Sequence, residues 1–225
     1  MAISEQKVQV DLYYDVISPY AWIAFESLLR YENVWPIKVN LKPFSLRGVM
    51  QESGNRPPGF VPAKSMYMLK DLERNNAYWN MKLKPPKSFM KWIKTKSSDN
   101  AMKLLLVVQK EQPGCSYVFE LRLDHLRVLA TIVALALLNP PNSRFLQLCV
   151  LKIVEFEKLE SVSREFWKRI WTRGEPIFER EDFEQVLLAS GVSNTAHYID
   201  KIADAAVEHE LQKNTSDAID SGVGD

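Results

Sequence analysis

The chain has 225 residues, a length that suits one or two domains. It is 46% hydrophobic and 25% charged, which is typical of a folded globular protein and excludes a disordered chain. The formal net charge of +1 gives no general attraction to nucleic acid. The two cysteines, Cys115 and Cys149, lie too far apart for a Cys-x-x-Cys redox pair and are too few for a four-thiolate zinc site.

Membrane, secretory and metal signals are absent from the sequence. The longest apolar run, 128–138, is about half of the ~20 residues that a bilayer span needs. The polar N-terminus, 1–7, lacks the features of a secretory signal. The three histidines form no His-Glu-x-x-His motif, and neither a P-loop nor a Gly-x-Gly-x-x-Gly motif occurs. We therefore expect no membrane span and no metal site.

The N-terminal part of the chain predicts a βαβ unit. Apolar residues alternate over 8–14, which indicates a strand, and over 37–44, which indicates a second one. Between them, 21–31 has the apolar spacing of a helix, with Ser18 as its cap and Pro19 at its first position. A strand, a helix and a strand within so short a stretch predict two parallel strands.

The remainder predicts helices and no further strand. Helical patterns cover 64–80, 97–110, 157–172, 181–190 and 194–212, and the pair Trp167 and Trp171 has the spacing of core residues on one helical face. The segment 114–156 differs in composition, because it is rich in leucine, holds both cysteines and contains the run 128–138, which has no polar face. Such a segment is deeply buried, packs on a partner or does not belong to the fold.

The most informative motif is Asp-Val-Ile-Ser-Pro-Tyr at 15–20, where the first strand meets the first helix. This edge of a βαβ unit is a common binding site, and the N–H groups of the helix N-terminus favour an anion such as a thiolate. Ser18 has a structural role as a cap, and a nucleophilic role would need a base that the nearby sequence does not supply. The residues alone thus predict an anion site without naming the anion.

Four segments together resemble the kappa-class glutathione transferases. They are 13–22, the Ser-Gly-Asn-Arg-Pro-Pro-Gly stretch at 53–59, 67–72 and 164–171, and the resemblance covers about 1–113 and 157–220. This family shares the DsbA-like thioredoxin fold with bacterial 2-hydroxychromene-2-carboxylate isomerases. The resemblance implies an α/β protein with that fold, in which an N-terminal βαβ part is followed by a large helical insertion domain.

The resemblance also implies a division of the chain. The N-terminal part of the thioredoxin-like domain is 1–50, the helical insertion domain is 51–215 with the atypical block 114–156 inside it, and 216–225 is a truncated tail. We expect this chain to lack the closing ββα lobe of the family and therefore to have weak or no activity. We expect that the block and the early stop come from unspliced or mispredicted gene segments.

The implied function is transfer of the glutathione thiolate to electrophiles, with an additional peroxidase activity and a role in detoxification. Glutathione is then a co-substrate, and no cofactor is bound. DsbA-type relatives carry Cys-x-x-Cys where this chain has 18–21, so the serine hydroxyl of Ser18 is the group that would stabilise the sulfur. Matching positions assign glutathione binding to Ser18, Pro19, Tyr20, Asn55 and Lys64, and the electrophile side to Tyr20 and Trp22.

Two alternatives stay open at this point. One is a glutathione-dependent isomerase of the 2-hydroxychromene-2-carboxylate type, and the other is a non-catalytic fragment or binding module. The resemblance further implies a homodimer in the mitochondrion or the peroxisome, whose partners are glutathione and a small electrophile or peroxide. Nucleic acid is not an expected partner.

Overall fold

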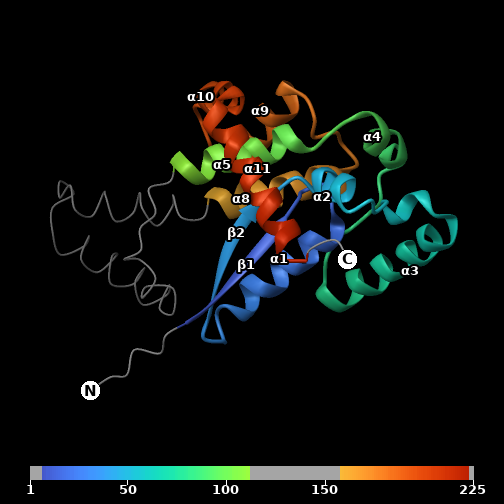
Figure 1. Cartoon of the computed structure of the whole chain (residues 1–225). Helices are drawn as coiled ribbons and strands as arrows, with labels where there is room; N and C mark the ends of the chain where they lie inside the picture. The colour runs from blue at the N-terminus through green and yellow to red at the C-terminus, as the bar shows by residue number, and fades with distance from the viewer. Residues whose placement is uncertain (1–6, 112–157, 223–225) are drawn as a thin grey trace, which may run out of the picture.

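The computed structural model describes residues 7–111 and 158–222 (Figure 1). The atypical block at 114–156 therefore lies outside the described residues, and so do both cysteines. In Figure 1 the helices surround a short central sheet, and α3 (Pro62–Trp79) and α4 (Phe89–Thr95) lie at one side of the molecule.

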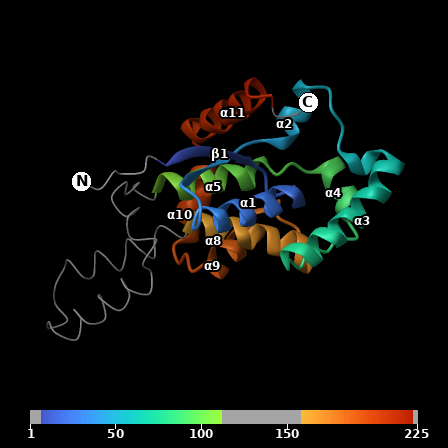
Figure 2. The ribbon, with the colours of Figure 1, turned by 90° about the horizontal axis from the view of Figure 1, so that it is seen from below.

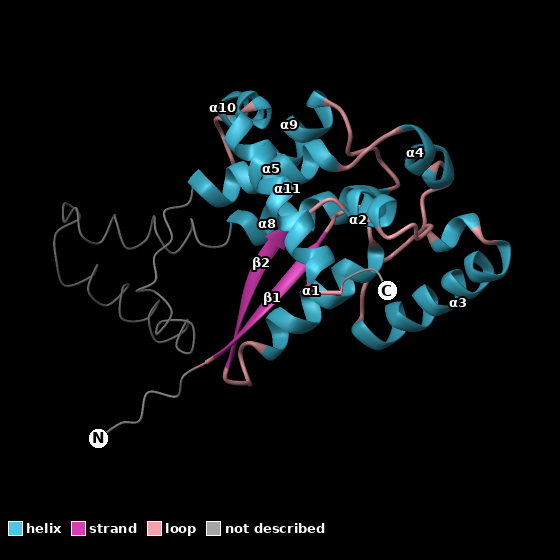
Figure 3. Ribbon diagram, in the orientation of Figure 1, coloured by secondary structure: helices cyan, strands magenta, loops and turns pink. Residues whose placement is uncertain are grey.

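The predicted βαβ unit is confirmed. Strands β1 (Val8–Tyr14) and β2 (Ile37–Pro43) are parallel, with Val8 opposite Ile37 and Tyr14 opposite Pro43. They form the two-stranded sheet of the described residues, and helix α1 (Pro19–Tyr31) connects them (Figure 3). The alternation predicted from sequence is therefore correct, since the side chains of Leu12 and Tyr14 are buried on the core face.

Helix α1 begins as its sequence predicts. The Ser18 Oγ accepts a hydrogen bond from the Ala21 N–H at 3.2 Å, and Pro19 is the first helical residue. A proline suits this position because its fixed φ matches the helix and its missing N–H would have no partner there. The junction of β1 and α1 is therefore set by local sequence.

The other described helices follow the predicted ones closely, with three differences. Helices α3, α5 (Asp99–Glu111) and α9 (Arg180–Ala189) match the predicted segments. The predicted segment 157–172 is α8 (Lys158–Trp167) continued by a wide π turn, η3 (Lys168–Arg173). The single helix predicted over 194–212 is wrong, because the chain is extended at Asp204 (φ −64°, ψ 132°) and starts a new helix there. Two helices, α2 and α4, were not predicted.

The bounds of the described helices after β2 are α2 Leu46–Glu52, η1 Pro58–Phe60, α3 Pro62–Trp79, α4 Phe89–Thr95, α5 Asp99–Glu111, α8 Lys158–Trp167, η3 Lys168–Arg173, α9 Arg180–Ala189, α10 Thr195–Asp200, η4 Lys201–Ala203 and α11 Ala205–Asp220.

The last described helix returns to the N-terminal unit. The Asn214 side-chain amide donates to the Pro43 carbonyl at 2.9 Å, and the Ser45 N–H donates to the Thr215 Oγ1 at 3.0 Å. Figure 2 shows α11 beside α2 on one side of the sheet, with α1 and α8 on the other. The predicted segment boundaries at 50/51 and 215/216 fall inside α2 and α11 respectively.

The core is built around α8 and η3. Trp167 and Trp171 are both fully buried, which confirms their prediction as core residues. The Trp167 ring packs against those of Phe25 and Tyr14, with centroids 4.9 and 5.5 Å apart. Its Nε1 donates to the Ser18 carbonyl oxygen at 3.1 Å, so the core fixes the start of α1 directly.

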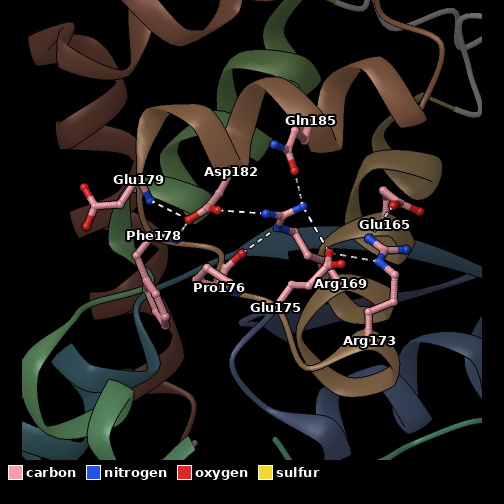
Figure 4. A network of polar contacts seen from close by, with 9 residues as sticks. All are labelled: Glu165, Arg169, Arg173, Glu175, Pro176, Phe178, Glu179, Asp182 and Gln185. Carbon is pink, nitrogen blue, oxygen red and sulfur yellow. Dashed lines mark hydrogen bonds and ion pairs between the residues drawn. The ribbon is translucent and has the colours of Figure 1, made fainter. Parts of the chain in front are cut away.

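A buried guanidinium joins η3 to α9 (Figure 4). Arg169 is 7% exposed and donates from Nη2 to Asp182 at 2.8 Å, from Nη1 to Gln185 at 2.7 Å and from Nε to the Pro176 carbonyl at 2.6 Å. An ion pair with Glu175 at 3.1 Å completes its surroundings. Such planar, multidentate recognition is specific to arginine.

Asp182, which binds Arg169, also binds the backbone of the chain segment before α9. Its Oδ2 accepts the backbone N–H groups of Phe178 and Glu179 at 2.9 and 3.0 Å, and the Glu179 side chain caps the first turn of α9 in return. The Glu179 carboxylate also pairs with Lys96. The Arg169 network therefore positions the Glu179 carboxylate beside Lys96.

Candidate active site

A cavity of about 330 Å³ opens where β1 ends and α1 begins. Its wall includes the cap Ser18 and the first residue Pro19 of α1, Leu46 of α2, Asn55 of the following loop, and Lys96 of the loop before α5. This volume lies within the range of small-molecule sites, ~300–1,000 Å³. The cavity thus occupies the edge of the sheet at which the sequence predicted a binding site.

Ser18 presents a hydroxyl that is already oriented. One of its lone pairs accepts the Ala21 N–H, so its own proton points elsewhere and is available to an acceptor in the cavity. The Tyr20 N–H lies in the first turn of α1, where helix geometry provides no carbonyl for it. The site combines a hydroxyl donor with the positive end of a helix dipole.

Asp15 lies behind this wall and is fully buried. Its carboxylate accepts hydrogen bonds from the Ile17 N–H at 3.0 Å, the Leu46 N–H at 3.1 Å and the Ser98 hydroxyl at 2.8 Å. Burial raises the pKa of Asp15 from its ordinary value of 3.8 to about 6; the three hydrogen bonds lower it, and the charge of Asp99 raises it further.

This raised pKa predicts a pH dependence of stability. The folded state holds the Asp15 proton more tightly than the unfolded chain, so charged Asp15 costs stability above pH 6, and that cost disappears as the pH falls towards 4. A shift of about two pKa units corresponds to about 3 kcal/mol. We expect the free energy of unfolding of the wild type, relative to the Asp15→Asn variant, to rise by about this amount from pH 7 to pH 4. Urea unfolding at each pH measures it, and a constant difference would contradict the prediction.

The cavity is basic. Arg47, Arg56 and Lys96 line it, and none of the described residues in its wall is Asp or Glu. Lys96 is paired with Glu179, which lies outside the wall. Such a lining favours a ligand that carries carboxylates.

Of the site residues predicted from sequence, some line the cavity and others lie elsewhere around α1. Ser18, Pro19 and Asn55 line the cavity together, and Asn55 Oδ1 accepts the Arg56 N–H at 2.8 Å. Lys64 is exposed in the first turn of α3 and is not among the described residues of the cavity wall. Tyr20 points to α3, where its hydroxyl donates to Asp71 at 2.9 Å.

Trp22, which was predicted to face the electrophile, lies in the interior. It is 6% exposed, its ring is stacked on that of Trp167 at 6.2 Å, and its Nε1 donates to Glu26 at 3.1 Å. The structure thus places it on the core side of α1, and the cavity described above does not include it.

Sequence reasoning did not select Asp15, Arg47 or Lys96. Asp15 stands in the 15–20 motif, and a polar residue directly after a buried strand is a visible signal. Arg47 follows Ser45, which caps α2 by accepting the Gly48 N–H at 3.0 Å, and this cap is also visible in sequence. Lys96 has no local signal, because only the tertiary fold brings its loop to the cavity.

No metal-binding cluster was found among the residues that the structure describes, namely groups of three or more His, Cys, Asp or Glu side chains. Within those same ranges no helix is both long and apolar enough to cross a membrane.

Comparison with known proteins identifies the family. The model of the DSBA-like thioredoxin domain matches residues 9–121 and 125–224. Glutathione S-transferase kappa 1 of Caenorhabditis elegans is 35% identical over 213 residues, which are 94% of this chain and 75% of that protein. The chain belongs to the kappa-class glutathione transferases. Kappa 1 proteins of Rattus norvegicus and Homo sapiens are 32% and 31% identical, each over 95% of this chain and 76% of the relative.

A solved structure supports the fold of this kappa-class chain. 2-Hydroxychromene-2-carboxylate isomerase superposes with a TM-score of 0.59, over 96% of this chain and 82% of that protein, at 13% sequence identity. At this identity the likeness shows the fold alone. The DsbA-like thioredoxin fold expected from the sequence is thereby confirmed, and so is the resemblance to the kappa class.

Proposed function

We propose that this chain is a glutathione transferase that conjugates the thiolate of glutathione to electrophiles at the cavity beside Ser18. The observation that carries the proposal is the Ser18 hydroxyl, which caps α1 on the cavity wall and keeps its proton for a ligand. Membership of the kappa class supports it, because the kappa relatives are named as glutathione transferases.

The chemistry follows from the groups at the start of α1. A thiolate placed there accepts the Ser18 O–H and lies at the positive end of the helix dipole. Both interactions favour the anion over the thiol and lower the pKa of the bound sulfur. The thiolate then attacks the electrophile, forming a carbon–sulfur bond while the leaving group departs with its electron pair.

The lining also suits the rest of glutathione, a tripeptide with two carboxylates. Arg47 and Arg56, whose guanidinium groups can bind carboxylates, line the wall together with Asn55. The absence of Asp and Glu from the described wall residues avoids repulsion of those carboxylates. The residues of the wall therefore fit an anionic peptide ligand.

The resemblance alone supports several further proposals. They are a glutathione-dependent peroxidase activity, a role in detoxification, a homodimer, and a mitochondrial or peroxisomal location. The isomerase alternative has less support, because its structural likeness is limited to the fold. A non-catalytic binding module would bind glutathione without conjugating it, and the following assay separates that alternative.

The Ser18→Ala variant tests the proposal. We expect kcat/KM for conjugation of 1-chloro-2,4-dinitrobenzene to fall about 10–100-fold, since one hydrogen bond to a charged sulfur contributes roughly 1.5–3 kcal/mol. The pKa of bound glutathione, read from the pH dependence of the rate, should rise.

Ser27→Ala is the matched control. Ser27 lies on the same helix, outside the cavity wall, and donates to the Ala24 carbonyl at 3.0 Å, so its loss should leave kcat/KM unchanged. Thermal unfolding of Ser18→Ala shows whether loss of the Ser18 cap, which contributes about 1 kcal/mol, impairs folding. A wild-type protein that does not bind glutathione in calorimetry, or a folded Ser18→Ala variant with full activity, would overturn the proposal.

A further inference from the structure

We infer that Asp15 is a positioning residue of the glutathione site, which holds separate segments of the cavity wall in register from behind. The inference rests on the proposed function above. Asp15 itself is not among the described residues of the wall, yet the groups that it binds are.

The three donors to Asp15 come from different elements. Ile17 belongs to the link between β1 and α1, Leu46 is the first residue of α2, and Ser98 precedes α5. All three residues line the cavity. One buried carboxylate thus connects three walls that are remote in sequence.

The contact with Ile17 determines how Ser18 is presented. The Asp15 side chain accepts the Ile17 N–H, and the Asp15 carbonyl accepts the Ser18 N–H at 3.0 Å. Side chain and backbone of the same residue therefore fold the loop that ends at the Ser18 cap. The Ser18 carbonyl is held on its other side by Trp167.

A carboxylate suits this position better than an amide. Both of its oxygens accept, and here one receives Ile17 while the other receives Leu46 and Ser98. An asparagine would turn its NH₂ group towards one of the backbone N–H donors, and that donor would lose its partner. The Asp15→Asn variant therefore keeps the size of the side chain while it releases one wall segment.

Three variants test the inference. Asp15→Asn should raise the Kd for glutathione about tenfold in calorimetry, because the Ser18 and Leu46 walls are no longer aligned. Asp11→Asn is the matched control on the preceding strand β1, where Asp11 is exposed and accepts at the surface from Asn40, and its Kd should equal that of the wild type. Val186→Ala removes a buried side chain from α9, outside the cavity wall, and provides a destabilised protein for comparison.

The outcomes decide between a positioning role and general stability. A tenfold rise in Kd for Asp15→Asn, with an unchanged Kd for Val186→Ala, supports the inference. An unchanged Kd for folded Asp15→Asn overturns it, and so does an equal rise in both variants. If Asp15→Asn does not fold, Ser98→Ala removes a single donor to the carboxylate, and an unchanged Kd in that variant also overturns the inference.

Hydrogen exchange separates this inference from the proposed function. If the wild type binds no glutathione, the proposed function fails. The positioning role is then tested by NMR, which follows the hydrogen exchange of the backbone amides of Ile17 and Leu46. Faster exchange of both amides in Asp15→Asn than in Val186→Ala supports the positioning role, and equal exchange overturns it.

Discussion

Replacing Arg169 by methionine is expected to lower the free energy of unfolding by about 3–5 kcal/mol. The reason is the charge that the substitution leaves behind. Asp182 is 6% exposed, and without the guanidinium its carboxylate would be buried with only the Phe178 and Glu179 N–H groups as partners. Gln185 and the Pro176 carbonyl would lose their donor as well.

The chain offers a matched control for Arg169→Met. Arg180 and Asp200 form an ion pair with the same 2.8 Å contact, but their side chains are 57% and 65% exposed. Water solvates that pair, so Arg180→Met should cost at most about 1 kcal/mol. Urea unfolding followed by circular dichroism measures both variants, and similar losses for the two would contradict the assignment of the large effect to burial.

Replacing Trp167 by alanine is expected to cost about 3–5 kcal/mol of unfolding free energy. The side chain is fully buried and is packed against Trp22, Phe25 and Tyr14. Its removal would create a cavity beneath α1 and would release the Ser18 carbonyl. We therefore expect both lower stability and weaker conjugation activity.

Two further substitutions resolve this effect into its parts. Trp167→Phe keeps an aromatic ring and loses the hydrogen bond to Ser18, so it should be less destabilising than the alanine variant while it still affects activity. Trp35 is 54% exposed and is stacked on Tyr31 at 4.3 Å, and Trp35→Ala should cost less than about 1.5 kcal/mol. A Trp167→Ala protein as stable as Trp35→Ala would refute the prediction.

Local sequence signals were sufficient for the N-terminal unit. The alternation in β1 and the Ser18–Pro19 start of α1 depend on residues that are close in sequence, so the pattern and the structure agree. The break at Asp204 had only a weak signal: aspartate is a common first cap of a helix, but its side chain makes no capping hydrogen bond here, and neither glycine nor proline stands there. It lets Ile199 and Val207, on either side of the break, both join the core, which is a requirement of tertiary packing. Helix α2 is too short to show a clear periodicity.

The same distinction applies to the site. Ser18 and Asn55 belong to short motifs, and the structure brings both to one cavity. The contribution of Leu46 and Ser98 could not be predicted, since their bonds to Asp15 span 31 and 83 residues of sequence. Periodicity contains no information about which distant loop meets which strand.

The bonds from α11 to the start of α2 also constrain when this protein can acquire its shape. Asn214 and Thr215 hold Pro43 and Ser45 across sequence separations of 171 and 170 residues. Contacts of such separation close late, because the chain must first lose the entropy of a very large loop. During synthesis, a ribosome must therefore complete Thr215 before Pro43 and Ser45 can form these two hydrogen bonds. Until then the nascent β1–α1–β2 unit has only the marginal stability of a two-stranded sheet with one helix.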